Sequence, residues 1–333
     1  MTSGHAVVLR SYPEGLPRAT DFEWVPETTS EPGDGQALLR ILWASIDPAM
    51  RTWHSAKPGR GVVRPLGTVM KAVAVAEVVE SRNSLRVGDH VVGSFGMREW
   101  CISDGADVTR VLDAGIEPRL GLGTLGHIGL TAFAGLHKVA RAQAGETVLV
   151  SSAAGATGAL AGQIAAAAGC RVIGIAGGPD KAAICRTEYG FDICIDRHAE
   201  TDLVGAIRAA APEGIDVFFD NVGGPTLDAA MQNMNALGRV AICGTISVRS
   251  SEPGHGPRHE RLMLDKQLTV QGFLTSQFEV DYPEMLESLS LLHSEGRLHL
   301  REVVVEGAEN APLALEQLLA GEFAGKVLVR IAA

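Results

Sequence analysis

The second half of the chain alternates short apolar runs with helical segments, and this alternation restricts the possible folds more than any other feature. The runs ETVLVS, CRVIGIAG and FDICID are followed, in order, by an Ala-rich segment, PDKAAICRTEY and DLVGAIRAAA, which have the composition of helices. The pattern continues through IDVFFD, TLDAAMQNMNAL and RVAICG to a sixth strand at QLTVQGFL. Strands that alternate with helices in this way form βαβ units. The sequence therefore predicts an α/β fold with a doubly wound parallel sheet.

The first part of the chain has a different rhythm, with short β-like runs between residues 37 and 111 that are separated by turns. Such spacing is typical of a compact β-rich domain. The closing runs EVVVEG and KVLVRI, on either side of a helical segment, return to this pattern. A chain of 333 residues exceeds the usual size of a single core. We therefore expect two domains, one formed by residues 1–122 and completed by 297–333, the other formed by 123–296.

A glycine-containing turn joins the first strand of the second domain to its helix. It reads Ala153-Ala154-Gly155-Ala156-Thr157-Gly158, an A-x-G-x-x-G version of the dinucleotide-binding motif. The first glycine would let the backbone approach a pyrophosphate, and the second would let the helix pack closely on the sheet. Free N–H groups at the start of the helix favour phosphate. The alternative is a tight turn in an unrelated α/β protein, which the position between a strand and a helix disfavours.

The residues after the second strand indicate which dinucleotide is bound. An enzyme specific for NAD carries an acid there for the ribose hydroxyls, whereas this chain has Gly177-Gly178 and then Lys181 in the first turn of the next helix. A cation at that position can bind the 2′-phosphate of NADPH. Arg197, after the third strand, would add a second cation, and a solvated Arg without a ligand is an equal alternative. The sequence predicts NADPH or NADP⁺ as the cofactor.

The overall charge limits the range of partners. A formal net charge of -10 argues against binding to nucleic acid or to an anionic membrane surface, since both require clustered Lys and Arg. Five widely spaced cysteines fit free thiols better than a disulfide framework. No segment resembles a signal peptide or approaches about 18 apolar residues in a row. We expect a cytoplasmic protein without disulfides.

Several motifs spread along the chain resemble the medium-chain dehydrogenase/reductase superfamily. They are SIDPAMR at 45–51, GLTAF at 129–133, SSAAGATGALAGQIA, FFDNVGG at 218–224 and ICGTIS at 242–247. The likeness runs essentially end to end and is specific to the zinc-free branch of prostaglandin, leukotriene and alkenal double-bond reductases. It implies a GroES-like catalytic domain, a Rossmann domain that binds NADPH, and a homodimer joined through the Rossmann sheets. It also implies hydride transfer from NADPH to the β-carbon of an α,β-unsaturated carbonyl.

The resemblance assigns cofactor contacts to residues beyond the glycine turn and Lys181. It implies that Asn221 touches the ribose or phosphates and that Thr131 lies beside the nicotinamide. The segment that would border the nicotinamide ribose is Cys243, Gly244, Thr245, Ile246 and Ser247. The segment that would lie near the carboxamide is Phe273, Leu274 and Thr275. The alternatives are that Asn221 caps a turn and that Cys243 fills the core.

The same resemblance indicates where the substrate lies. The residues that would line its pocket are Ala49 of the DPAMR segment, Trp53, His127, Gln277 and Phe278. Where relatives carry a tyrosine after the ICGTIS segment this chain has Arg249, and none of its three tyrosines matches a catalytic position. Arg249 and His54 are therefore the candidate catalytic groups. A surface position for Arg249 and a structural role for His127 are the alternatives.

The cysteines argue against a metal. Zinc alcohol dehydrogenases of the superfamily require several Cys ligands, whereas Cys101 stands alone here, so we expect no zinc site. Reduction of a conjugated double bond requires positioning and stabilisation of charge on the carbonyl oxygen, without a covalent nucleophile. That oxygen could be held by the ribose 2′-hydroxyl or by donors in the pocket, and the proton could come from water. Quinone reduction and a non-catalytic NADPH-binding protein are the alternative functions.

Overall fold

The structure is a computed structural model that describes residues 1–56, 62–247 and 256–332. The chain forms two compact units, unit 1 (Met1–Leu122 with Glu302–Ala333) and unit 2 (Gly123–Arg301). The sequence predicts the second boundary after residue 296, but the next five residues stay with unit 2. Two hydrogen bonds explain this, because the Arg297 guanidinium donates to the Ala167 carbonyl at 2.7 Å and the His299 N–H donates to Gln163 Oε1 at 2.7 Å.

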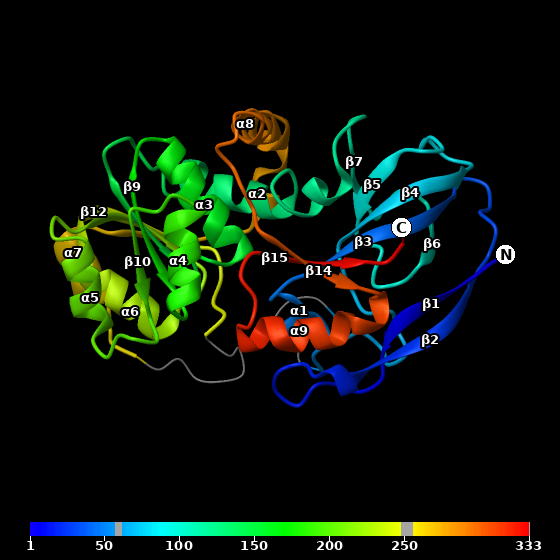
Figure 1. Cartoon of the computed structure of the whole chain (residues 1–333), viewed down its shortest axis with the longest axis horizontal. Helices are drawn as coiled ribbons and strands as arrows, with labels where there is room; N and C mark the ends of the chain where they lie inside the picture. The colour runs from blue at the N-terminus through cyan, green and yellow to red at the C-terminus, as the bar shows by residue number, and fades with distance from the viewer. Residues whose placement is uncertain (57–61, 248–255, 333) are drawn as a thin grey trace. The chain divides into compact units, whose positions relative to one another are not determined.

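Unit 1 is built on a β-sheet to which residues 37–111 and the C-terminal strands contribute, and the N-terminal strands form a separate two-stranded sheet (Figure 1). Its elements are β1 (Thr2–Leu9), η1 (Ala19–Asp21), β2 (Phe22–Thr29), β3 (Ala37–Ile46), α1 (Met50–Trp53), β4 (Ala74–Ser81), β5 (His90–Gly93), β6 (Trp100–Ser103), β7 (Val108–Val111), η2 (Pro118–Leu122), β14 (Glu302–Glu306), η5 (Ala308–Asn310), α9 (Ala311–Ala320) and β15 (Lys326–Arg330). The main sheet has seven strands in the order β14-β15-β3-β4-β5-β7, with β6 also paired to β3. The C-terminal strand β15 runs antiparallel to β3, which places Val327 opposite Ile46. The chain ends therefore complete the same domain.

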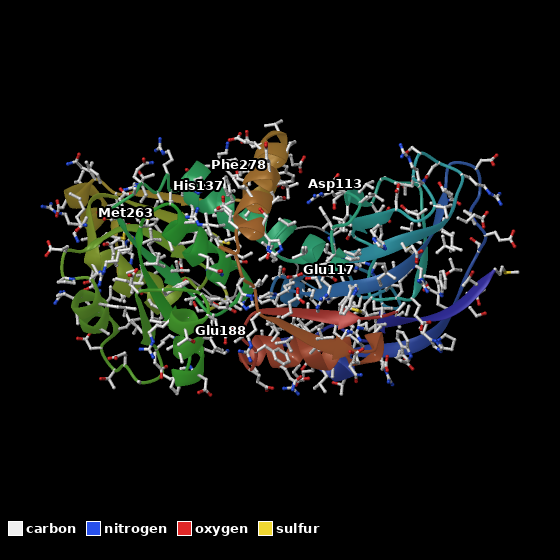
Figure 2. All side chains as sticks on the ribbon, turned by 45° about the horizontal axis from the view of Figure 1, so that its top comes forward. Asp113, Glu117, His137, Glu188, Met263 and Phe278 are labelled. Carbon is white, nitrogen blue, oxygen red and sulfur yellow. The ribbon has the colours of Figure 1, made fainter. Side chains whose placement is uncertain are left out.

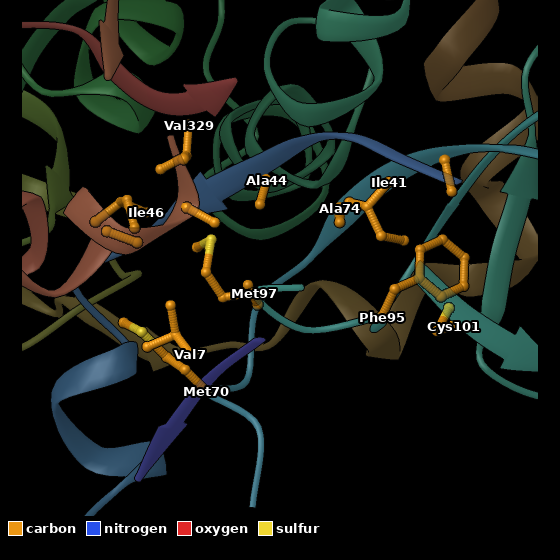
Figure 3. Packing of buried hydrophobic residues seen from close by; sticks show 14 of the residues in the cluster. Val7, Ile41, Ala44, Ile46, Met70, Ala74, Phe95, Met97, Cys101 and Val329 are labelled. Atoms are coloured by element: carbon orange, nitrogen blue, oxygen red, sulfur yellow. The ribbon is translucent and has the colours of Figure 1, made fainter. Parts of the chain in front are cut away.

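The core of unit 1 follows from the apolar residues of β3. Ile41, Ala44 and Ile46 are almost completely buried and pack with Met70 and Met97 in one cluster (Figure 3). Burying a side chain of the size of Ile or Met contributes about 1.5–3 kcal/mol each. Helix α9 adds three buried apolar residues to the same cluster. This rigid base supports the loops that leave the ends of β3.

Unit 2 is a Rossmann fold. Its elements are α2 (His127–Phe133), the π-helix η3 (Ala134–Val139), β8 (Thr147–Ser151), α3 (Ala156–Ala167), β9 (Arg171–Ala176), α4 (Pro179–Thr187), β10 (Ile193–Asp196), α5 (Leu203–Ala210), β11 (Ile215–Asp220), α6 (Gly224–Asn233), β12 (Met234–Ile242), α7 (Glu260–Lys266), β13 (Thr269–Gly272), η4 (Thr275–Asp281) and α8 (Tyr282–Ser294). The six strands are parallel and lie in the order β10-β9-β8-β11-β12-β13. The predicted α/β fold, with a parallel sheet in unit 2 and a β-rich unit 1, is confirmed. In such sheets ligands bind where the strand order reverses, here outside the carboxyl ends of β8 and β11.

Two local features of unit 2 depend on close packing and on backbone conformation. The glycine-rich connection before β8 forms α2 and η3, and a Cβ at Gly135 would lie 2.4 Å from the Phe219 ring, so close packing explains this glycine. Helix α6 ends at Asn233, although the sequence predicts that it continues through TLDAAMQNMNAL. Met234 has an extended backbone and Leu237 has a φ of 62°, and neither conformation can continue an α-helix. The chain therefore enters β12 earlier than expected.

Within the described ranges, we find no helix with the length and apolar character needed to cross a membrane.

Candidate functional site

Strands β8 and β11 end side by side at the point where the strand order reverses. Ser151 is the last residue of β8, and its hydroxyl donates to the carboxylate of Asp220, the last residue of β11, at 2.8 Å. The same carboxylate accepts from the N–H groups of Val222 and Gly223 at 2.9 and 3.0 Å. The Asn221 side-chain amide donates to the Ser151 carbonyl at 2.7 Å. These bonds fix the turn between β11 and α6 against the end of β8.

Asp220 is fully buried and connects a third strand to this turn. Its backbone carbonyl accepts from the N–H groups of Cys243 and Gly244, which follow β12, at 2.8 and 3.0 Å. Burial raises the pKa of Asp220, while the hydrogen bonds from Val222, Gly223 and Ser151 oppose that rise. Asn221 was predicted from the resemblance, whereas Asp220 and Ser151 were not. The available signal was an acid at the end of the apolar strand IDVFFD, because a buried carboxylate must find hydrogen-bond partners.

The predicted phosphate turn lies directly after β8. Ser152 takes a left-handed conformation with a φ of 51°, and Gly155 is the extended residue before α3. A Cβ at Gly158 would lie 2.3 Å from the Ser152 carbonyl oxygen, so a larger residue would displace the turn from the helix. The first N–H groups of a helix have no partner within that helix. Gly155 thus precedes a twelve-residue helix that begins with Ala156, Thr157 and Gly158, in a geometry that fits a dinucleotide pyrophosphate.

The segment from Cys243 to Ser247 lies against the turn after β11. The Ser247 N–H and hydroxyl both donate to the Val222 carbonyl, at 3.0 and 2.7 Å, and the Ile246 N–H donates to the Asn221 carbonyl at 3.4 Å. Gly244 and Thr245 belong to the same segment. The structure therefore brings residues 243–247 together with Asn221. Burial, with a smaller contribution from Asp220, raises the pKa of Cys243 to about 12. This thiol is therefore not an activated nucleophile.

Two threonines join the segment after β13 to helix α2. The hydroxyl oxygens of Thr131 and Thr275 are 2.5 Å apart, and the Thr131 hydroxyl donates to the His127 carbonyl at 2.7 Å. Because a hydroxyl has one proton, Thr275 is the donor in the pair. Phe273 packs edge-on against Phe219 of β11, with ring centroids 6.3 Å apart. The predicted nicotinamide-side residues Thr131, Phe273 and Thr275 are therefore held next to the switch point.

The remaining predicted residues of unit 2 lie on the neighbouring helical surface. The Leu274 N–H donates to Gln277 Oε1 at 3.2 Å, which holds the start of η4. Lys138 of η3 pairs with Asp281 at the end of η4 at 3.5 Å, so Phe278 and His137 belong to adjacent segments (Figure 2). His127 is exposed at the start of α2. His127 and Gln277 therefore lie at the surface of unit 2 and not in its core.

The carboxyl ends of β9 and β10 present cations. Oδ1 of Asp196 accepts from the N–H groups of Gly178 and His198 at 2.7 and 2.9 Å, so the acid at the end of β10 serves the backbone. The Arg197 guanidinium donates to the His198 ring at 3.0 Å. Lys181 stands in the first turn of α4, and burial lowers its pKa. This arrangement fits a phosphate better than a pair of ribose hydroxyls.

In unit 1 a buried ion pair fixes the DPAMR segment. Lys326 of β15 is 2% exposed, and its ammonium contacts the Asp47 carboxylate at 2.6 Å, the Ile46 carbonyl at 3.2 Å and the Ser45 hydroxyl. Ala49 is exposed just before α1. Trp53, at the end of α1, lies beneath the Lys71 ammonium, which is 5.0 Å from the ring centroid. The ion pair was not foreseen, since its partners are 279 residues apart.

The structure argues against His54 as a catalytic group, and we correct that expectation. Its side chain is 1% exposed, its Nε2 accepts from the Lys71 N–H at 3.0 Å, and its Nδ1 lies 3.1 Å from the Met50 carbonyl. Nδ1 must therefore carry the proton and donate it. Burial lowers the pKa of His54 to about 4, with Arg64 and Lys71 adding to this effect against the hydrogen bond to Met50. A neutral imidazole with both nitrogens occupied is structural. The other catalytic candidate, Arg249, lies outside the described residues.

The residues described do not offer a zinc site. Among them, no three His, Cys, Asp or Glu side chains are grouped closely enough to hold a metal ion. Cys101 is buried, and burial raises the pKa of its thiol to about 12. A thiol binds zinc as the thiolate, so this environment is unfavourable for a metal ligand.

A Rossmann sheet with a glycine-containing turn at its switch point, together with a β-rich domain, is typical of one class, the dinucleotide-binding oxidoreductases. Comparison with known proteins gives the same class. Residues 5–111 match a family described as the N-terminal domain of oxidoreductase, and residues 156–291 match the family of zinc-binding dehydrogenases.

Individual relatives cover almost the whole chain. It is 37% identical to the NADPH-dependent curcumin reductase of Escherichia coli (strain K12), over 98% of this chain and 96% of the relative. It is 38% identical to prostaglandin reductase 1 of Bos taurus, over 99% and 100%. The crystal structure of CurA in complex with NADPH from Vibrio vulnificus matches with a TM-score of 0.90 and 34% identity, over 99% of each chain. The chain belongs to the medium-chain dehydrogenase/reductase superfamily, in the branch of the prostaglandin and alkenal reductases, and the resemblance seen in the sequence is confirmed.

Proposed function

We propose that the protein reduces the carbon–carbon double bond of α,β-unsaturated ketones or aldehydes with NADPH, by hydride transfer to the β-carbon and without a metal. The observation that carries this proposal is the network of Ser151, Asp220 and Asn221 at the switch point, which joins the end of β8 to the turn after β11 and to the segment that follows β12. The similarity to reductases named for NADPH and for unsaturated carbonyl substrates supports it.

The cofactor roles follow the geometry of unit 2. The start of α3, from Gly155 to Gly158, would hold the pyrophosphate, and Lys181 with Arg197 would hold the 2′-phosphate. Because Asp196 is occupied by backbone N–H groups, it does not compete for the ribose. Asn221 and the segment 243–247 would border the nicotinamide ribose. When bound, NADPH supplies the hydride.

The nicotinamide end would be oriented by the hydroxyl pair. Thr131 and Thr275 are held by each other and by the His127 carbonyl, so their positions are fixed before a ligand arrives. The Phe273 to Thr275 segment would contact the carboxamide, with Leu274 supported by Gln277. Such preorganisation lowers the entropic cost of placing two reacting carbons in contact.

The substrate pocket would be lined by Ala49, Trp53, His127, Gln277 and Phe278. The charge that develops on the carbonyl oxygen requires a donor, and Arg249 is the candidate by its place after the ICGTIS segment. His54 cannot supply the proton, because it is neutral and buried. We therefore assign the proton on the α-carbon to water.

The metal-free part of the proposal rests on the chemistry of the available ligands. Cys101 keeps its proton at neutral pH, and the described residues include no cluster of other ligands around it. The donor set does not fit the zinc that the name of the second matching family implies.

We also propose a homodimer joined through the Rossmann sheets. Strand β13 pairs with β12 on one side, and three of its four residues are exposed. An exposed edge strand readily pairs with another chain. Sedimentation of the purified protein should give twice 35.0 kDa, and a mass of one chain at micromolar concentration would contradict the dimer. Five unpaired cysteines support a cytoplasmic location.

The function is tested with purified protein, NADPH and a panel of enones, enals and quinones. Saturated ketones and aldehydes, identified by mass spectrometry, are the expected products. Hydroquinones alone would indicate a quinone reductase instead. Tight NADPH binding without reduction of any acceptor would indicate a binding protein.

A further inference from the structure

The turn between β9 and α4 consists of two glycines, and a histidine ring lies directly against it. A Cβ at Gly177 would lie 3.1 Å from both Cε1 and Nε2 of His198 and 3.8 Å from Nη2 of Arg197. The shorter of these distances leaves little room for a side chain at Gly177. Because this residue is a glycine, the His198 ring and the Arg197 guanidinium can lie over the turn together.

Hydrogen bonds hold the backbone of this pair against the turn. Oδ1 of Asp196 accepts from the Gly178 N–H at 2.7 Å and from the His198 N–H at 2.9 Å. Asp196 ends β10, where it is the sheet partner of Ala176 at the end of β9. The Arg197 N–H donates to the Ala176 carbonyl at 2.8 Å. The main chain that carries Arg197 and His198 is therefore fixed next to the residues that precede α4.

The His198 ring offers one hydrogen-bond acceptor to the Arg197 side chain. Nη2 of Arg197 lies 3.0 Å from Nε2 of His198. A guanidinium can only donate, so Nε2 is the unprotonated nitrogen of a neutral imidazole, and Nδ1 carries the proton. A guanidinium has five N–H donors, and this bond uses one of them. The ring thus restrains the guanidinium and does not compete with it for an anion.

Such a restraint matters because Arg197 is exposed. A long side chain that becomes ordered only when a ligand arrives loses its rotamer freedom at that moment, and the loss weakens binding. A guanidinium that is already held over the turn loses less. In a Rossmann fold the end of the second strand faces the 2′ position of the adenosine ribose, and that strand here is β9.

We propose that His198 is a positioning residue for the cofactor, whose ring holds Arg197 over the Gly177–Gly178 turn in the orientation that binds the 2′-phosphate. It thereby contributes to the preference for NADPH over NADH. This inference rests on the proposed function, in which Lys181 and Arg197 hold that phosphate. His198 acts through Arg197 and not through a contact of its own with the phosphate.

The test measures the binding of 2′,5′-ADP and of 5′-AMP to the purified protein by isothermal titration calorimetry. These nucleotides differ only in the 2′-phosphate, and we expect the wild type to bind 2′,5′-ADP more tightly. The ratio of the two Kd values should fall about threefold to tenfold in His198→Phe, which keeps a ring near Gly177 but offers no acceptor. His198→Gln, whose side-chain carbonyl can still accept from Arg197, should retain most of the ratio.

A matched control and a double-variant cycle separate positioning from other roles. His299→Ala removes a histidine ring that is 62% exposed elsewhere in unit 2, and it should keep the wild-type ratio. In the Arg197→Ala background, His198→Phe should cause no further loss, since no guanidinium remains to be held. A loss that persists in that background would overturn the positioning role. An unchanged ratio in His198→Phe, or an equal loss for both nucleotides, would also overturn it.

These binding measurements do not depend on the reaction, so the two proposals can fail separately. If the protein reduces no enone or enal while the nucleotide ratios behave as expected, the proposed function is wrong and the role of His198 stands. If the protein reduces enones with NADPH while His198→Phe keeps the wild-type ratio, the inference alone is wrong.

Discussion

The buried His54 makes unit 1 sensitive to acid, and this sensitivity can be measured. The pKa of His54 falls from 6.5 to about 4 in the folded chain. Between these values the unfolded chain binds the additional proton, so the stability that the neutral imidazole provides is complete above pH 6.5 and is lost as the pH falls towards 4. Each pKa unit corresponds to about 1.4 kcal/mol. From about pH 7.5 to 4.5 the loss is therefore about 2–3 kcal/mol in the free energy of unfolding.

The assay uses urea unfolding followed by tryptophan fluorescence. Trp24, Trp43, Trp53 and Trp100 all lie in unit 1, so the signal reports on that unit. In His54→Gln the side chain can still bond to both backbone partners but cannot titrate. The variant should lose about 2–3 kcal/mol less than the wild type over the same pH range, while other titrating groups contribute equally to both. Parallel pH curves for the two proteins would refute the assignment of His54 as a buried neutral residue.

Three further substitutions test other parts of the structure. Lys181→Ala should weaken NADPH binding at least about tenfold more than NADH binding, since only NADPH carries the 2′-phosphate; equal losses in titrations of both cofactors would remove the basis for NADPH preference. Lys326→Met should cost about 3 kcal/mol in urea unfolding because it removes the buried ammonium that pairs with the Asp47 carboxylate, against less than about 1 kcal/mol for Arg40→Met at a more exposed pair. Asp220→Asn should weaken NADPH binding about tenfold by placing an amide NH₂ against the N–H groups of the turn, and wild-type affinity would show that the network does not position the site.

The sequence predicted best where a local pattern decides the structure. The strand and helix alternation, the glycine turn and Lys181 depend on neighbours a few residues away, and the structure has them as expected. The segments expected near the nicotinamide were identified by resemblance, and a hydrogen bond joins two of their residues, Thr131 and Thr275.

The failures concern contacts between distant residues. Nothing local shows that Ser151 faces Asp220, or that Lys326 is buried against Asp47, because these pairs form only when the sheets assemble. His54 was misjudged for the same reason, since the sequence around a histidine does not show whether its side chain is exposed or buried. The helix α6 was predicted too long because apolar periodicity does not show where the backbone turns at Met234.

The most direct test of the proposed reaction follows the hydride itself. The protein is incubated with 3-nonen-2-one and NADPH that carries deuterium at the transferred position, and the product is analysed by mass spectrometry and NMR. We expect 2-nonanone with one deuterium on the carbon that was β to the carbonyl, and a proton from water on the α-carbon. Deuterium on the carbonyl carbon of an unsaturated alcohol, or oxidation of NADPH without a deuterated ketone, would contradict the proposed function.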